Sequence, residues 1–171
     1  MISENYRKLN RQLHEENPAY GTSGHKFGQF VTNLYRQFGG TVLDYGCGKQ
    51  TLQDAVPEIQ ITGYDPCIPG LDKQPVPHDL VVCTDVMEHI EPEHLDAVIE
   101  DLARVTRKAL FVTIATRPAK KILADGRNAH LIQEDFRWWL PRFWDDFDIR
   151  QTVISDGEII LMGVPRGGIR N

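Results

Sequence analysis

Short apolar segments alternate along this chain with longer segments of helical periodicity. The apolar segments are TVLDYG (41–46), IQITGYD (59–65), DLVVCTD (79–85) and ALFVTIAT (109–116). Apolar residues recur at helical spacing in 27–38 and in 95–105, and Pro92 stands where the second of these helices should begin. Strands that alternate with helices predict a mostly parallel sheet with right-handed crossovers. DLVVCTD is apolar on both faces, as expected of a strand that helices cover on both sides.

The C-terminal part of the sequence predicts an antiparallel hairpin. Residues 148–155 and 158–165 read as strands, and Asp156-Gly157 between them is typical of a turn. A helix is expected at 136–143, which Pro141 should kink or end. We therefore expect a Rossmann-like, doubly wound α/β fold with a C-terminal antiparallel strand. The chain shows no repeat or linker, so we expect one domain over 1–171, with 1–24 as an N-terminal extension or lid.

Glycines and acidic residues follow the predicted strands. Gly46 and Gly48 come after the first strand, and Asp44 lies just before them. Asp65 ends the second strand and Asp85 the third. In a parallel sheet these ends face one crevice, where glycines allow close approach to a ligand and an acid can accept hydrogen bonds from a ribose. A glycine pair followed by an acid at the end of the next strand is much more specific than either alone.

The segments VLDYGCGKQTL, ITGYDP and DLVVCTDVMEHI resemble three successive motifs of class I S-adenosylmethionine-dependent methyltransferases. The ending D-x-x-E-H is similar to that of the small-molecule branch of this family. The resemblance extends over roughly residues 25 to 165 and implies that S-adenosylmethionine is the cofactor. Taken one at a time, the same residues can also be read as strand-end caps and an ordinary turn.

The resemblance also implies roles for individual residues. Gly46, Cys47 and Gly48 would run beneath the methionine part of the cofactor, with Asp44 near its amino group. Asp65 would hold the ribose hydroxyls. Pro66 or Cys67 would line the adenine, and Thr84 and Asp85 would lie close to the methionine end or the methyl group.

The sequence departs from the family pattern in two places. Gln50 stands where the glycine loop usually has a third glycine or another small residue, a position that concerns helix packing more than the ligand. In addition, only PCIPGLDKQPVPH separates Asp65 from the next strand, too little for the helix and strand that the family has there. We expect an abbreviated sheet edge between these strands, with the adenine held by residues 66–71.

Two histidines are candidates for removing a proton from the methyl acceptor. His89 follows the third predicted strand, and His130 lies in a loop after the fourth. Histidine titrates near neutral pH and suits a general base. Asp85, placed near the methyl group by the resemblance, completes the catalytic candidates. Each histidine has an alternative reading as a capping or packing residue.

A metal centre is not expected from local spacing. EHIEPEH lacks the HExxH pattern, and Pro92 falls between its two histidines. The cysteines Cys47, Cys67 and Cys83 lack C-x-x-C pairing and are read as packing residues.

Basic and aromatic residues suggest an acceptor side. A basic segment follows the fourth predicted strand and could receive an anionic acceptor, or be a solvated loop; it contains Arg117, Lys120, Lys121 and Arg127. Trp139 should be core, whereas Trp138 could stack on an acceptor or face a neighbour. Tyr20 and His25 are candidates for a lid over the cofactor.

Charge and composition limit the classes of function expected of this chain. The net charge is -5, which argues against a nucleic-acid partner. No signal-like or membrane-spanning segment is evident, so we expect a cytoplasmic protein without a membrane partner. We expect a methyltransferase for a small-molecule or saccharide-like acceptor. The alternatives are a nucleic-acid or nucleotide methyltransferase and a degenerate, non-catalytic cofactor-binding domain. The sequence leaves the oligomeric state open.

Overall fold

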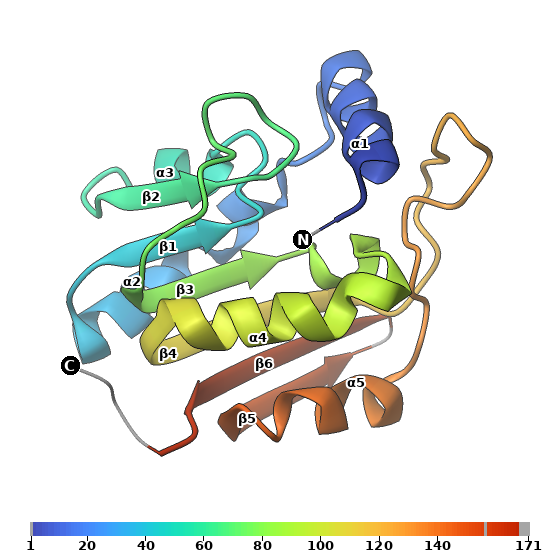
Figure 1. The fold of residues 1–171 in the computed structure, drawn as a ribbon. Helices are drawn as coiled ribbons and strands as arrows, with labels where there is room; N and C mark the ends of the chain where they lie inside the picture. Colours follow the sequence, from blue (N-terminus) through green and yellow to red (C-terminus); the bar gives the residue numbers. More distant parts are fainter. Residues whose placement is uncertain (1, 156, 168–171) are drawn as a thin grey trace.

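The computed structural model describes residues 2–155 and 157–167. The fold is built around one mixed β-sheet. Its six strands lie in the order β2-β1-β3-β4-β6-β5 (Figure 1). The strands are β1 (Val42–Tyr45), β2 (Ile61–Tyr64), β3 (His78–Thr84), β4 (Thr106–Ala115), β5 (Phe147–Ser155) and β6 (Glu158–Pro165). The helices are α1 (Glu4–Glu16), α2 (Gly28–Phe38), α3 (Thr51–Ala55), α4 (Leu95–Val105) and α5 (Phe136–Phe143), with 3₁₀ turns at Ser23–Phe27, Met87–His89 and Pro92–His94.

Strand direction confirms the predicted fold class. β1 pairs in parallel with β2 and β3, and β3 pairs in parallel with β4. β6 runs antiparallel to both β4 and β5, as the hairpin pattern predicts. Asp156 of the predicted hairpin turn lies outside the described residues.

Alternate residues of the central strands feed two separate cores. On one face, Val81 and Cys83 of β3 pack with α4 and α5, which lie in front of the sheet in Figure 1. On the other face, Leu80 and Val82 pack with residues of α2 and α3. Successive side chains of a strand point to opposite faces, so a run of apolar residues is what a doubly covered strand needs.

The sheet ends early on the β2 side. β2 is the edge strand, and residues 66–77 form turns with no helix or strand. This confirms the abbreviated edge that the short, proline-rich segment predicts. Pro141 was expected to kink or end its helix, and α5 does end two residues after it, at Phe143.

The sequence analysis did not identify helices α1 and α3, of which α1 is the longer. Ser3 caps α1 by accepting a hydrogen bond from Tyr6 N. The backbone N and Oγ of Ser3 both donate to the Glu91 carboxylate, each at 2.7 Å. Farther along, Arg11 Nε donates to Cys67 O at 3.2 Å. These contacts hold α1 beyond the carboxyl ends of the strands (Figure 1).

None of the helices in the described part of the chain combines the length and the apolar character that crossing a membrane requires.

Candidate functional site

The predicted site residues line one cavity of about 580 Å³ at the carboxyl ends of β1, β2 and β3. It is bordered by every residue that the sequence analysis assigned to cofactor or catalysis: Asp44, Gly46, Cys47, Gly48, Asp65, Pro66, Cys67, Thr84, Asp85, His89 and His130. The structure therefore brings the whole predicted set together. The roles of the individual residues remain predictions.

The loop after β1 depends on two glycines. Gly46 has a φ of +78°, and a Cβ there would lie 2.3 Å from Val86 Cγ2. Gly48 has a φ of +49°, and a Cβ there would lie 2.5 Å from the backbone oxygen of Gly21. Both positions thus combine a left-handed backbone with a close neighbour, and only glycine meets both demands without strain.

Gln50 adopts a left-handed conformation as well, with a φ of +57° and a ψ of +28° at the start of α3. Its backbone N donates to Cys47 O at 2.8 Å, which closes the loop. A non-glycine residue in this region costs about 1–2 kcal/mol. Gln50 does not line this cavity, but it borders a smaller hollow next to it, so the departure from a third glycine concerns both the turn and the rim of that hollow.

Asp65 ties the loops after β1 and β2 together. Its Oδ2 accepts a hydrogen bond from Gly48 N at 3.1 Å, and its Oδ1 accepts one from Cys67 N at 2.9 Å. Burial raises the pKa of Asp65, while these two bonds and the nearby His14 oppose the rise. A carboxylate oxygen can accept more than one hydrogen bond, so Asp65 keeps acceptor capacity toward the cavity.

Asp44 is a buried acid with no ion-pair partner in the described residues. Burial and repulsion from Asp65 raise its pKa from 3.8 to about 7. Two acids that share a buried wall make that wall receptive to a cation.

Replacing Asp44 by asparagine should stabilise the ligand-free protein at alkaline pH. The pKa of the folded state lies above the unfolded value, so the folded state binds the proton more tightly. Stability is therefore lost as the pH rises from about 4 to about 7, and the asparagine variant escapes this loss. We expect a gain of roughly 2–4 kcal/mol in the free energy of unfolding at pH 8 that disappears near pH 4.

Urea titrations at pH 4 and pH 8 measure this effect. Asp145→Asn, at an exposed position after α5, is the matched control and should change little at either pH. A gain of equal size at both pH values would contradict the assignment to Asp44.

Asp85 has an unusual backbone. Its φ is +53°, and its backbone N lies 3.2 Å from both the carbonyl oxygen and the Oγ1 of Thr113. Strained residues of this kind concentrate at functional sites. The bend carries the chain from β3 into the 3₁₀ turn that presents His89 to the cavity.

The two histidines face one another with perpendicular rings whose centroids are 4.8 Å apart. His89 Nδ1 lies 2.7 Å from Ala129 O, and His130 Nδ1 lies 2.6 Å from Arg117 O. A carbonyl oxygen only accepts, so each Nδ1 carries the hydrogen. Burial lowers the pKa of His89 to about 4 and also lowers that of His130, so both rings are neutral near pH 7. Each Nε2 then has a free lone pair.

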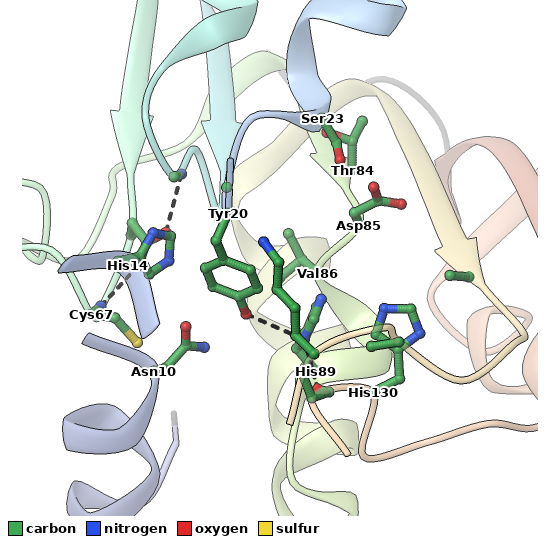
Figure 2. Close-up of a pocket in the computed structure, with 18 of the residues that line it drawn as sticks. Asn10, His14, Tyr20, Ser23, Cys67, Thr84, Asp85, Val86, His89 and His130 are labelled. Atoms are coloured by element: carbon green, nitrogen blue, oxygen red, sulfur yellow. Dashed lines mark hydrogen bonds between the residues drawn. The ribbon is translucent and has the colours of Figure 1, made fainter. Parts of the chain in front are cut away.

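Tyr20 divides the cavity into two sides. Figure 2 shows it between His14 and Cys67 on one side and His89 and His130 on the other. Its ring contacts both His14 and His89, with centroid distances of 4.6 and 5.7 Å. Sequence reasoning anticipated Tyr20 but missed Asn10 and His14, which reach the cavity from α1. No motif marks these two residues.

Four basic residues also line the cavity: Lys26, Arg117, Lys120 and Lys121. One of them, Lys121, packs over the Tyr20 ring with Nζ 4.9 Å from its centroid. Arg127, predicted with them, is not a lining residue, since its guanidinium pairs with Asp125 at 2.8 Å. Trp138 does not line the cavity either; the Arg142 guanidinium packs over its ring at 3.3 Å from the centroid, which agrees with the alternative that it faces a neighbour. Trp139 is fully buried, as expected.

The structure distinguishes between the two residues predicted to form a lid. His25 is exposed and is not a lining residue, so of the two lid candidates only Tyr20 borders the cavity.

The three cysteines are free and buried, and burial raises the pKa of each thiol, which agrees with a packing role.

Comparison with known proteins adds independent findings. A family model described as "Methyltransferase domain" matches residues 7–155. No curated protein sequence matches the chain.

Solved structures show the same fold at low sequence identity. Magnesium protoporphyrin IX methyltransferase (ChlM) from Synechocystis PCC 6803, with bound SAH, is 18% identical with a TM-score of 0.63, covering 85% of this chain and 83% of that one. The 1,6-didemethyltoxoflavin-N1-methyltransferase of Burkholderia thailandensis, with its substrate and S-adenosylhomocysteine bound, is 10% identical with a TM-score of 0.69, covering 96% and 91%. N-methyltransferase NodS from Bradyrhizobium japonicum WM9, with SAH, is 13% identical with a TM-score of 0.61, covering 96% and 100%.

Proposed function

The chain belongs to the S-adenosylmethionine-dependent methyltransferases, and from this premise we propose that its acceptor is a small, anionic molecule. The observation that carries the proposal is the composition of the cavity wall. Acids and glycines line it at the ends of β1 and β2, and basic side chains from the turn before α2 and from the segment after β4 line it as well. The first set suits the cofactor and the second suits a negatively charged acceptor.

The methionine part of the cofactor is assigned to the loop after β1. Gly46, Cys47 and Gly48 let the backbone approach it closely. Asp44 lies beside them, and its raised pKa marks a buried acid that lacks a cation. The ammonium group of the cofactor would supply that charge, so the residues present fit the group.

The nucleoside part is assigned to the loop after β2 and to α1. Asp65 faces the ribose hydroxyls, and Pro66 and Cys67 border the adenine. The family's additional strand is missing here, and α1 supplies a wall instead, because Arg11 binds Cys67 O and His14 lines the cavity. A smaller hollow of about 320 Å³ continues between α1 and residues 67–71. Its position supports an adenine held by this segment.

The N-terminal residues act as a cover in this proposal. We assign 1–171 to a single methyltransferase domain in which 1–24 close the site. Lys49 N donates to Gly21 O at 2.9 Å, and Lys49 Nζ donates to Asn17 O at 2.8 Å. The segment is thus attached directly to the glycine loop, so closure and cofactor binding should be coupled.

Catalysis is assigned to the side of the cavity beyond Tyr20. S-adenosylmethionine supplies an electrophilic methyl group on a sulfonium that leaves readily. The chain must align the acceptor, exclude water and take up the acceptor's proton. Asp85, His89 and His130 face this side, and a neutral imidazole with a free Nε2 can accept a proton. Thr84 lies at the end of β3, near the proposed position of the methyl group.

The basic side chains favour an acceptor with a phosphate, a carboxylate or an acidic sugar. Arg117, Lys120 and Lys121 come from the segment after β4, and Lys26 comes from the turn before α2. The presence of four basic side chains around one cavity stands out in a chain with a net charge of -5. Guanidinium and ammonium groups bind such anions by charge-assisted hydrogen bonds.

Removing the basic side chains should weaken acceptor binding without affecting the cofactor. In assays with labelled S-adenosylmethionine and panels of anionic, neutral and cationic acceptors, we expect transfer to anionic ones. For the best acceptor, Arg117→Ala and Lys120→Ala should each raise KM roughly tenfold to a hundredfold. The affinity for S-adenosylhomocysteine should stay within about twofold.

Arg127→Ala is the matched control, because Arg127 comes from the same segment but pairs with Asp125 outside the cavity. Preferential transfer to neutral acceptors, or to an RNA oligonucleotide with strongly salt-dependent binding, would overturn the proposed acceptor class.

A further inference from the structure

Three side chains at the acceptor end of the cavity form a compact buried cluster. Glu88 and His89 come from the 3₁₀ turn after β3, and His130 comes from the segment after β4. One potential ligand atom from each lies within 4.8 Å of the others; Glu88 and His130 are buried, and His89 is partly buried. Two imidazoles and one carboxylate are a ligand set that zinc and other divalent transition metals accept.

Hydrogen bonds orient both imidazoles for coordination. Each Nδ1 donates to a backbone carbonyl, that of Ala129 for His89 and that of Arg117 for His130. This leaves each Nε2 with an unprotonated lone pair. Metal-binding histidines are commonly held in this way, with the second ring nitrogen donating to a carbonyl or carboxylate.

The burial and hydrogen bonding of Glu88 provide a second, independent indication of a bound cation. Its side chain is fully buried, and its Oε1 accepts a hydrogen bond from Ala115 N at 2.9 Å. Its Oε2 is buried with no hydrogen-bond partner in the structure. An unsatisfied buried carboxyl oxygen is costly, and a bound cation would remove that cost.

We propose that Glu88, His89 and His130 bind one divalent transition-metal ion, with zinc as the best match. The ligand atoms lie within 4.8 Å of one another, so the side chains close around the ion when it binds. His89 and His130 both line the cavity, so a fourth position is open to the acceptor. The carboxylate of Asp85 adds negative charge near both rings, and the Arg117 guanidinium opposes it at His130.

Such an ion would define the class of acceptor. A metal that binds a hydroxyl oxygen lowers the pKa of that hydroxyl, so the oxygen becomes the nucleophile. The imidazole lone pairs are then used for coordination, and Asp85 is the remaining group in place to take the proton. The metal site itself rests on the geometry of the cluster, whereas this use of it rests on the proposed function.

Cobalt(II) titration of the chelator-treated, full-length protein tests the site directly. We expect saturable binding of about one ion per chain, a visible absorption spectrum of low-symmetry cobalt, and displacement by zinc. His130→Ala and Glu88→Gln should each weaken cobalt binding at least roughly a hundredfold. His94→Ala, a histidine outside the cluster, should bind cobalt like the unaltered protein.

Circular dichroism and S-adenosylhomocysteine affinity, measured on the same samples, separate the possible failures. If the protein binds S-adenosylhomocysteine but shows no saturable cobalt binding, the metal site is wrong and the proposed function stands. If the cluster variants are folded and bind cobalt unchanged, the assigned ligands are wrong. If the unaltered protein does not bind S-adenosylhomocysteine, the proposed function is wrong instead.

Discussion

Replacing Asp65 by asparagine should lower the affinity for S-adenosylmethionine and S-adenosylhomocysteine at least a hundredfold. The carboxylate is assigned to the ribose hydroxyls, and a charge-assisted hydrogen bond contributes about 1.5–3 kcal/mol. The substitution also affects the protein itself. Asp65 accepts from the backbone N of Gly48 and of Cys67, and an asparagine turns an NH2 group toward one of these two donors. Loss of the ligand contact therefore comes together with loosening of both binding loops.

Isothermal titration with S-adenosylhomocysteine measures this change. Asp72→Asn is the matched control in the same loop region, because Asp72 is exposed and accepts only from the nearby Gly70 N. It should bind the ligand like the unaltered protein. A folded Asp65→Asn variant whose affinity changes less than twofold would refute the role of Asp65.

Replacing Gly48 by alanine should weaken cofactor binding and destabilise the protein. The added Cβ would lie 2.5 Å from Gly21 O and 2.8 Å from Gly21 Cα, and both are backbone atoms that cannot rotate away. The segment around Gly21 must retreat, which breaks the hydrogen bond from Lys49 N and opens the wall that includes Tyr20. We expect a loss of about 2–4 kcal/mol in stability and a tenfold or greater loss in cofactor affinity.

The variant Gly39→Ala distinguishes the effect of a steric clash from the effect of backbone strain alone. Gly39 also has a positive φ, +60°, but a Cβ there would meet no atom within 4 Å. Its ψ of -175° places it in a region that glycine alone adopts readily, so this variant should cost about 1–3 kcal/mol and leave cofactor affinity unchanged. Denaturant titration and calorimetric binding measure both effects. If the two variants lose equal stability and both retain cofactor affinity, packing of Gly21 on Gly48 has no part in the site.

The order of strands and helices could be predicted because the pattern of each element is local. The continuous apolar run in β3 reflects cover on both faces, and alternate residues of β3 do reach the two cores. Asp156-Gly157 indicated the hairpin, and the short segment after Asp65 indicated the missing strand. Each of these signals lies within a few residues of the element that it specifies.

Helix α1 was missed although its sequence carries a helical signal, since Ser3 can cap it and Tyr6, Leu9 and Leu13 recur at helical spacing. Its position over the strand ends could not be predicted, because the contacts that hold it there are remote in sequence. Ser3 binds Glu91, and Arg11 binds the carbonyl of Cys67. The residues that α1 adds to the cavity, Asn10 and His14, were missed for the same reason.

The sequence by itself determined the architecture of the sheet and the acids and glycines at its strand ends, because parallel strands bring their carboxyl ends together. Only the tertiary structure decided what faces them. It placed α1 beside the segment after β2, where Arg11 binds Cys67 O, and left Trp138 and Arg127 outside the cavity. It also brought His130 together with His89 and Glu88. The spacing around His89 gave no reason to expect a metal, because the third group comes from a segment whose position is fixed by packing and not by the chain nearby.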